Sequence, residues 1–369
     1  MIPISLLIKP ASGLCNLNCE YCFYQDVAAN REVGSYGIME VSVLEAVLRH
    51  SLEEADGICA IAWQGGEPTL AGLDFFKKAV DFQRRFNHRN IAVSNSLQTN
   101  GYGLGETWAS FFFENRFLLG VSLDGLEATH DLFRKNKSGN GSYSSIMKTL
   151  DLFRRYRVDY NILTVVNSAT ARNIKDIYAW YRKQDFRYQQ YIACLDQLGQ
   201  KPGGNKWSLT PEVYGEFLIN LFDLWYEDCL RGTAPYIRQF ENYIGLLLGI
   251  LPEACEQRGI CSPNLIIEAD GSVYPCDFYV TDAYCMGNLA EQPLHEILKS
   301  PVIKQFTFRS TILDAQCKHC PYLKLCRGGC YRHRTVDSSG RFLNYFCESY
   351  RSFFDHRLDR LKHLAAMIS

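Results

Sequence analysis

The sequence has almost no net charge, no long hydrophobic run and no internal repeat. Its 39 basic residues nearly balance 40 acidic ones, so a formal net charge of -1 offers no general attraction to nucleic acid or an anionic membrane. No apolar stretch is long enough to span a bilayer, and the first one reaches Lys9 without the basic start of a secretory signal. We therefore expect a cytoplasmic protein with no nucleic-acid or membrane partner.

Cysteine, by contrast, is abundant, with 15 residues in a chain of 369. Disulfides are rare in a reducing cytoplasm, and an odd total does not suit a simple paired framework. The cysteines therefore indicate metal binding or catalysis.

Three of them form the most informative motif. Cys15, Cys19 and Cys22 have the spacing C-x3-C-x2-C in the run CNLNCEYCFY, directly after the strand-like segment ISLLIKP. Three thiolates can hold a 4Fe-4S cluster and leave one iron open to bind a small molecule. A zinc site or a set of buried thiols would use the same three residues, and the spacing alone leaves these alternatives open.

The first half of the chain alternates strand-like and helix-like segments. The apolar, β-branched runs are 3–8, 58–64, 91–98, 117–123, 158–166 and 188–193. The amphipathic stretches between them are 41–55, 73–86, 107–114, 143–157 and 173–183. Six successive βα units predict a parallel sheet that curls into a partial barrel with an open side, so the expected fold class is α/β.

Polar motifs follow the ends of these strands, where parallel barrels collect their chemistry. They are the cysteine triad, the sequence GGEP at 65–68, Gln98-Thr99-Asn100, Ser122 with Asp124, and Leu195-Asp196. Two glycines at a strand end would let the backbone approach a ligand closely, although glycine pairs also mark ordinary turns.

The pattern changes after about residue 200. A loop at 200–206 precedes two helical segments, 211–231 and 237–251, the second of which we expect to cover part of the barrel. We expect a barrel domain in residues 1–235 and a cysteine-rich domain in 236–369 that ends in a helix.

Both cysteine groups resemble known signatures. The triad, with aromatic residues at Tyr21, Phe23 and Tyr24, resembles that of the radical S-adenosylmethionine (SAM) enzymes, in which the open iron chelates SAM. The run CKHCPYLKLCRGGC, followed by Cys347, resembles the SPASM domain of radical SAM enzymes that modify peptides. The fold that this implies is a radical SAM partial (β/α)6 barrel with a SPASM domain that binds two auxiliary clusters.

The resemblance implies three 4Fe-4S clusters and divides the cysteines among them. The sets are Cys15, Cys19 and Cys22; Cys255, Cys261, Cys276 and Cys330; and Cys317, Cys320, Cys326 and Cys347. Zinc is the alternative for the two sets of four thiolates, and the triad favours iron-sulfur. The remaining Cys59, Cys194, Cys229 and Cys285 lie in apolar or helical contexts and are expected to pack as small buried hydrophobes.

The same resemblance implies a SAM site. Its residues are Tyr21, Gly65, Gly66 and Glu67 of GGEP, Ser122, Arg134 and Leu195. Taken alone, Ser122 would more often be a turn residue, and Arg134 would more often form a surface ion pair.

Similarity to the anaerobic sulfatase-maturating enzymes extends through most of the chain. It is carried by IKPASGLCNLNCEYCFY, AWQGGEPTLAGL, NSLQTNG, LFDLWYED, ADGSVYPCDFYV and the cysteine-rich end. Membership implies radical oxidation of a cysteine or serine in a sulfatase motif to Cα-formylglycine. The implied partners are an unfolded sulfatase or other peptide substrate, and an electron donor such as flavodoxin or ferredoxin.

The resemblance also assigns roles around the substrate. Asp277, in the family segment YPCDFY, is the candidate proton acceptor, although an aspartate after a strand is commonly a turn or capping residue. Gln64, Gln98, Tyr24 and Asn100 are candidate contacts to an extended peptide, and each would alternatively order loops around SAM.

Two alternative functions are also compatible with part of these motifs. A SPASM maturase that forms thioether crosslinks in a ribosomal peptide shares the clusters and SAM, but such enzymes often carry an extra N-terminal recognition domain, for which we expect no room here. A multi-cluster electron carrier or zinc-stabilised binding module would not explain an open three-cysteine cluster at the mouth of a barrel.

Overall fold

The computed structural model describes residues 2–336 and 339–368, which form two compact units. The first unit comprises Met1–Ser122, Arg134–Tyr160 and Pro263–Phe306, and the second comprises Leu123–Phe133, Asn161–Ser262 and Thr307–Ser369. Both units are discontinuous in sequence, so the boundary expected between residues 235 and 236 stays a prediction.

A sheet forms the centre of the first unit, with the strand order β10-β9-β8-β1-β2-β3-β4. Its strands are β1 (Ile2–Ile8), β2 (Ala55–Trp63), β3 (Ala92–Thr99), β4 (Leu118–Ser122), β8 (Leu265–Ile267), β9 (Ser272–Tyr274) and β10 (Gly287–Asn288). Strands β1 to β4 are parallel neighbours, and β8 adds to β1 in parallel. The late segment 265–288 therefore extends the sheet begun by the first strand.

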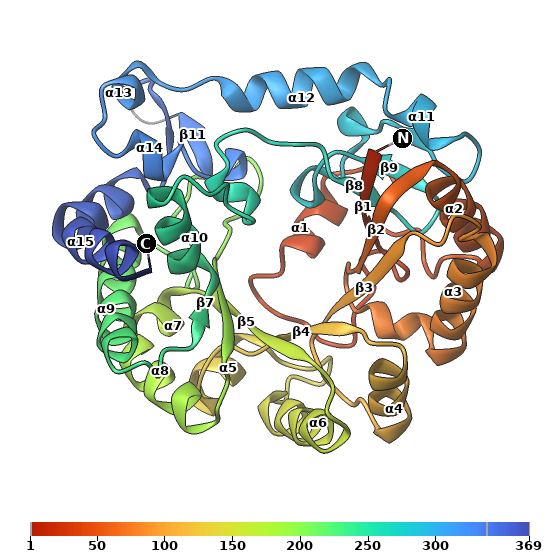
Figure 1. Cartoon of the computed structure of the whole chain (residues 1–369), viewed down its shortest axis with the longest axis horizontal. Helices are drawn as coiled ribbons and strands as arrows, with labels where there is room; N and C mark the ends of the chain where they lie inside the picture. Colours follow the sequence, from red (N-terminus) through yellow and green to blue (C-terminus); the bar gives the residue numbers. More distant parts are fainter. Residues whose placement is uncertain (1, 337–338, 369) are drawn as a thin grey trace. The chain divides into compact units, whose positions relative to one another are not determined.

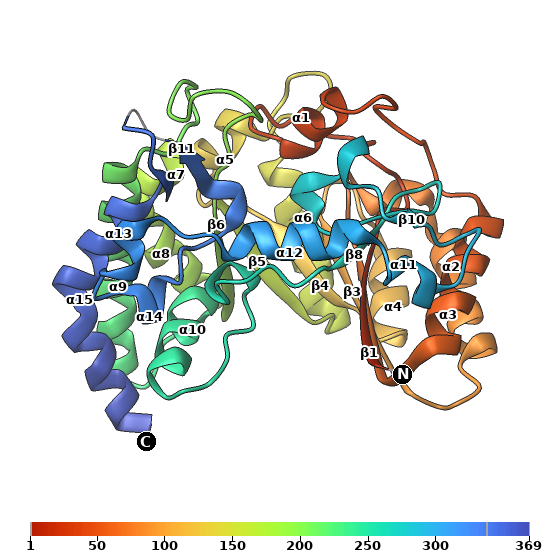
Figure 2. The ribbon, with the colours of Figure 1, turned by 90° about the horizontal axis from the view of Figure 1, so that it is seen from above.

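The helices of the first unit are α1 (Phe23–Ala29), α2 (Val41–Glu54), α3 (Leu73–Phe86), α4 (Glu106–Glu114), α6 (Tyr143–Tyr156) and α11 (Leu294–Ile297). In Figure 1, α2, α3, α4 and α6 lie outside the parallel strands, whereas α1 lies on their inner side. Helix α12 (Pro301–Thr311) contains the boundary between the two units. In Figure 2 the chain enters β1 at the lower edge of the view, and α1 lies toward the opposite edge, on the side where β1 ends.

Aromatic side chains fill the core between this sheet and its helices. Trp63 at the end of β2 lies 5.3 Å from Phe76 of α3, measured between ring centroids, in an edge-on arrangement. Phe76 in turn meets Phe117, and Phe117 meets Phe112 of α4. All four rings are almost fully buried, and burial of such large apolar surfaces is the main stabilising contribution to this unit.

The second unit contains three parallel strands, two groups of helices and a small hairpin. Its elements are β5 (Tyr160–Val166), β6 (Tyr188–Ala193), β7 (Tyr236–Ile237), β11 (Arg334–Val336), β12 (Phe342–Asn344), α5 (Glu127–Phe133), α7 (Ser168–Arg172), α8 (Ile174–Lys183), α9 (Pro211–Leu230), α10 (Arg238–Leu247), α13 (Ala315–Lys318), α14 (Leu323–Cys326) and α15 (Cys347–Ile368).

Helix α15 packs beside α9, and the two run side by side in Figures 1 and 2. Phe222 of α9 makes edge contacts with Phe240 of α10 and Phe353 of α15, at 5.1 and 5.4 Å between centroids. Helix α9 begins where a capping residue and proline predict it, because the Thr210 side chain accepts a hydrogen bond from the Val213 N–H.

The predicted strands and helices of the βα half are present, and most boundaries agree within three residues. Helix α10 ends at Leu247, four residues before the predicted end, because Gly249 adopts a positive φ of 78° that stops the helix. Strands β8 and β9 were not predicted. Within the described residues, no helix is both long and apolar enough to cross a membrane.

None of the fifteen cysteines, all of which lie in the described residues, forms a disulfide bond. The expectation that the four unassigned ones are buried is confirmed for Cys59 and Cys194. It is wrong for Cys285, which is exposed because it follows a short surface turn, and Cys229 is only half-buried.

Candidate active site

The cysteine triad lies in the loop that leaves β1, and α1 begins at Phe23, directly after Cys22. The Cys15 sulfur receives the Leu17 N–H at 3.4 Å and lies 3.5 Å from the Asn100 amide nitrogen. Burial raises the pKa of the Cys15 thiol to about 11. Such a thiol becomes a thiolate when a metal centre replaces its proton, which suits a cluster ligand.

Arg134 lies beside the triad. One guanidinium nitrogen is 3.9 Å from the Cys19 sulfur, and the guanidinium carbon is 5.4 Å from the centre of the Tyr21 ring. A cation here would offset the negative charge of thiolates and attract a carboxylate. This placement supports the predicted roles of Arg134 and Tyr21 at SAM, which stay predictions.

The glycines of GGEP are explained by a close approach between two backbone segments. A Cβ atom on Gly66 would lie 2.1 Å from the Leu14 carbonyl oxygen, and one on Gly65 would lie 2.7 Å from that of Ser12. The Gly66 N–H also donates to Ser12, and the Glu67 N–H donates to Leu14. The pair therefore holds the loop that carries the triad, and contact with SAM remains a prediction.

Glu67 is a fully buried carboxylate that accepts hydrogen bonds from residues just after β2 and at the end of β3. It accepts from the Thr69 N–H and hydroxyl, from the Thr99 hydroxyl at 2.9 Å and from the Asn100 N–H at 2.8 Å. Burial raises the pKa of Glu67, and these donors oppose the shift. Its contacts indicate that Glu67 supports the site by joining the ends of β2 and β3.

Asn100 connects this support to the triad. Its side-chain amide donates to the Asn16 side chain at 2.7 Å, and its carbonyl oxygen accepts from the Tyr102 N–H. Of the two predicted roles of Asn100, these bonds favour the ordering of loops. They do not favour direct contact with a peptide.

Three further residues predicted to contact SAM or substrate lie at the carboxyl ends of their strands or directly after them. Gln98 is the penultimate residue of β3, and Ser122 is the buried last residue of β4. Leu195 follows β6 in the second unit. Their contacts with SAM or substrate stay predictions.

Asp277 meets two of the predicted substrate residues. The Tyr24 hydroxyl donates to Asp277 Oδ2 at 2.6 Å, and the Gln64 amide lies 2.9 Å from the Tyr24 hydroxyl and 3.4 Å from Oδ2. Asp277 begins a single 3-10 turn directly after Cys276, which fixes its backbone. Three residues singled out in separate motifs thus form one hydrogen-bonded group at the end of β2 and the start of α1.

Burial raises the pKa of Asp277, while the nearby Lys9 ammonium and the Tyr24 hydroxyl act in the opposite direction. Burial also raises the pKa of Tyr24 well above its usual range, and the negative charge of Asp277 adds to this shift. Tyr24 is therefore a hydrogen-bond donor here, and the role of Asp277 as proton acceptor stays a prediction.

Sequence reasoning missed the charged residues behind Asp277. Lys9 is 1% exposed, and its ammonium lies 3.2 Å from Glu268 Oε1 and 3.8 Å from Asp277 Oδ1. Glu268 Oε2 lies 3.0 Å from Arg31 and accepts from the Ser12 hydroxyl at 2.6 Å. The only signal in the sequence was a lysine at the end of an apolar strand, where burial requires a charged partner.

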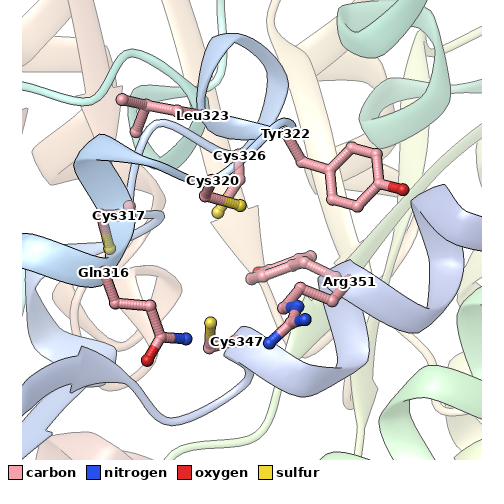
Figure 3. A pocket seen from close by; sticks show the side chains of 10 residues that line it. Gln316, Cys317, Cys320, Tyr322, Leu323, Cys326, Cys347 and Arg351 are labelled. Atoms are coloured by element: carbon pink, nitrogen blue, oxygen red, sulfur yellow. The ribbon is translucent and has the colours of Figure 1, made fainter.

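The second unit holds a pocket with four cysteine side chains around it (Figure 3). Cys317, Cys320, Cys326 and Cys347 line a pocket that opens to solvent. Their sulfurs face this pocket from α13, the turn after it, α14 and the start of α15. Burial raises the pKa of the Cys326 thiol to about 12 and that of Cys347 to about 11. A ring of four sulfurs around a shared space fits the predicted auxiliary cluster.

The other predicted set is divided between the units. Cys255, Cys261 and Cys330 lie in the second unit, where the two other thiols contribute to raising the pKa of Cys330 after burial, its first cause. Cys276 belongs to the first unit. The first three residues are therefore close to one another, and the complete set stays a prediction.

Comparisons with protein families agree with this chemistry. The family model for the Radical SAM superfamily matches residues 10–181, and the SPASM iron-sulfur cluster-binding domain matches residues 259–321. The chain is a radical SAM enzyme with a SPASM domain.

Full-length relatives define the family more closely. A cysteine-type anaerobic sulfatase-maturating enzyme of Clostridium novyi is 45% identical over 100% of this chain and 99% of its own length. A serine-type enzyme of Bacteroides thetaiotaomicron is 31% identical over 96% of this chain and 89% of its own length. The chain belongs to the family of anaerobic sulfatase-maturating enzymes.

The solved structure of native anSMEcpe with bound AdoMet and Cp18Cys peptide has the same fold. It matches with a TM-score of 0.95 and 43% identity over 100% of both chains. This match confirms the predicted fold class.

Proposed function

We propose that this enzyme oxidises a cysteine in a sulfatase active-site peptide to Cα-formylglycine, with serine as the second substrate to test. The observation that carries this proposal is the 45% identity over the full chain to a cysteine-type enzyme, compared with 31% to a serine-type one. The bound peptide in the structure of anSMEcpe supports a peptide substrate.

The triad and the two sets of four cysteines would hold three 4Fe-4S clusters, with SAM at the triad. When bound, these groups supply a 5′-deoxyadenosyl radical that takes a hydrogen atom from the substrate Cβ, and an acceptor for the second electron. Tyr21, Gly65, Gly66, Glu67, Ser122, Arg134 and Leu195 are the proposed contacts to SAM.

The chain itself supplies the proton acceptor. Loss of a hydrogen atom and an electron from the cysteine leaves a thiol proton to remove, and Asp277 is the proposed base. The Tyr24 hydroxyl bond to Oδ2 and the opposing effects of burial and Lys9 support this role. The thioaldehyde then exchanges sulfur for the oxygen of water, which gives the aldehyde and hydrogen sulfide.

We further propose that the reaction takes place in the cytoplasm, with flavodoxin or ferredoxin as the electron donor. The cysteine content of 15, with eleven of these residues assigned to clusters, supports a reducing compartment.

Mass spectrometry of a cysteine-containing sulfatase-motif peptide tests the proposal. After anaerobic incubation with reconstituted enzyme, SAM and reductant, we expect sulfur to be replaced by an aldehyde oxygen. The serine form of the peptide measures the preference, and the alanine form is the control. Loss of two hydrogens with sulfur retained would instead identify a thioether maturase, and an unchanged peptide beside 5′-deoxyadenosine would contradict this substrate class.

A further inference from the structure

Two polar side chains, Gln316 and Arg351, line the same pocket of the second unit as four proposed cluster ligands. These ligands are Cys317, Cys320, Cys326 and Cys347, and we call their shared space the cysteine pocket. Figure 3 shows the ends of the two polar side chains on either side of Cys347. The sequence motifs had singled out neither of them.

Arg351 reaches the pocket because of its place on α15. It lies one turn after Cys347, the first residue of that helix, and residues four apart share one face of a helix. Long side chains on a helix point toward its N-terminus, so the guanidinium extends toward Cys347 (Figure 3). The Arg351 side chain is 46% exposed and lies 3.4 Å from Glu348, which places its charge at the open end of the pocket.

The amide of Gln316 has a fixed orientation. Its backbone N–H donates to the Asp314 side chain at 2.9 Å, and Arg341 donates to Gln316 Oε1 at 3.0 Å. A guanidinium has no acceptor, so the amide oxygen faces Arg341 and the Nε2 group takes the other direction. In Figure 3 this nitrogen lies on the side of Cys347. Nε2 donates no hydrogen bond to the part of the chain that the structure describes.

A positive charge and a hydrogen-bond donor have the same effect on a thiolate-bound cluster. Such a cluster is anionic, and its reduction adds one more negative charge. A nearby cation and hydrogen bonds to the sulfurs stabilise the reduced form most, which raises the reduction potential. Arg351 supplies the charge and Gln316 supplies the donor, both on the side of Cys347.

We propose that Gln316 and Arg351 set the reduction potential of the auxiliary cluster in the cysteine pocket and so adapt it to accept the substrate's second electron. In this step one electron leaves the substrate and one enters the cluster, while the thiol proton goes to the proposed base. The inference rests on the proposed function and on the predicted set of ligands. Its test measures a potential without peptide, so the result does not depend on turnover.

A purely structural role makes a different prediction. The Arg341 bond to Gln316 connects α13 to the segment before β12, and Arg351 pairs with Glu348 within α15. If these contacts only hold the fold, each variant loses iron and melts at a lower temperature. The potential of the clusters that remain then equals that of the wild type.

Arg351→Gln is the main test, with the reconstituted enzyme followed by redox titration and electron paramagnetic resonance. Loss of the charge should make reduction of one cluster about tenfold less favourable, which is about 59 mV toward lower potential for one electron. The other two clusters should keep their potentials. Addition of SAM identifies the signal of the triad, because SAM binds there alone.

Two further arginine variants are the controls. Arg351→Lys keeps the charge, so the equilibrium constant for reduction should stay within about twofold of the wild-type value. Arg360 lies on the same helix, is equally exposed at 46% and pairs with Asp223, but it does not line the cysteine pocket. Arg360→Gln should therefore change no potential.

Glu348→Gln separates the effect of charge from the loss of the ion pair. This variant and Arg351→Gln break the same contact, so a structural consequence changes both enzymes in the same direction. The proposed role changes them in opposite directions, and loss of the Glu348 charge should make reduction about twofold more favourable. The shift in Arg351→Gln should also decrease at high salt, because the guanidinium is partly exposed.

Gln316→Met tests the hydrogen-bond donor alone. Methionine has a similar length and no N–H, so reduction should become about threefold less favourable. An unchanged potential in Arg351→Gln or in Gln316→Met would overturn the proposal. Shifts of the same sign in Arg351→Gln and Glu348→Gln would also overturn it, as would zinc in place of iron in the cysteine pocket.

The aldehyde assay keeps this inference apart from the proposed function. A wild-type enzyme that forms no aldehyde contradicts the proposed function, whatever the potentials of the variants. Wild-type aldehyde together with unchanged potentials contradicts only the roles of Gln316 and Arg351.

Discussion

Two buried acids of the first unit, Glu67 and Asp277, have opposite surroundings. Glu67 accepts hydrogen bonds from two threonines and the Asn100 backbone, so both its oxygens are occupied. Asp277 accepts hydrogen bonds on Oδ2, whereas Oδ1 accepts none within the described residues and lies 3.8 Å from the Lys9 ammonium. A carboxylate with both oxygens occupied holds loops together, and Asp277 differs from it by one oxygen that has no hydrogen-bond donor.

Asp277→Asn should have the largest effect, because it tests directly whether Asp277 is the proton acceptor. The amide cannot accept the thiol proton, so we expect aldehyde formation to fall by about 10²-fold or more while SAM cleavage and cluster content persist. Quantifying 5′-deoxyadenosine and aldehyde in the same reaction measures both. Full turnover by this variant would remove Asp277 from the mechanism.

Tyr24→Phe should have the next largest effect. It removes the 2.6 Å bond that orients Oδ2, and loss of a hydrogen bond to a charged group should reduce aldehyde per 5′-deoxyadenosine about tenfold. The variant keeps the ring, so the KM for SAM should not change. A peptide KM that rises with an unchanged ratio would show instead that Tyr24 serves substrate binding alone.

Glu67→Gln tests whether Glu67, the other buried acid, has only a structural role. An amide cannot accept from all the donors around it, so we expect a loss of about 1–3 kcal/mol in stability. The melting temperature and the iron bound at the triad should fall, while aldehyde per 5′-deoxyadenosine stays at the wild-type value. A change in that ratio would mean that Glu67 takes part in the chemistry.

Asn100→Ala should have the smallest effect. The variant loses the bond to Asn16 and the contact with the Cys15 sulfur, at a cost of about 1 kcal/mol. Because its amide faces the triad loop, SAM cleavage should decline slightly and the peptide KM should stay constant. A selective increase in the peptide KM would restore Asn100 as a substrate contact.

The sequence predicted this molecule best where signals are local. Helix α3 has the predicted bounds because its apolar face repeats at helical spacing and Gly72 precedes it. The resemblance of the cysteine-rich end to a SPASM domain likewise grouped the four cysteines that line the pocket around Cys347.

Less could be predicted where contacts join distant positions. Arg31 and Glu268 carry no motif, and only the pairing of β8 with β1 brings them together. The close approach of the GGEP glycines to the backbone of Ser12 and Leu14 was also invisible, because those residues lie far away in the sequence.

The pairing of β8 with β1 also sets the order in which the site can be completed during translation. Tyr24 and Asp277 are 253 positions apart, and the partner strand of β1 on that side is synthesised after the whole βα half. A chain still on the ribosome therefore exposes its cysteine triad long before Asp277, the proposed proton acceptor, can bond to Tyr24. Completion of this hydrogen-bonded group depends on the late segment reaching the first strand.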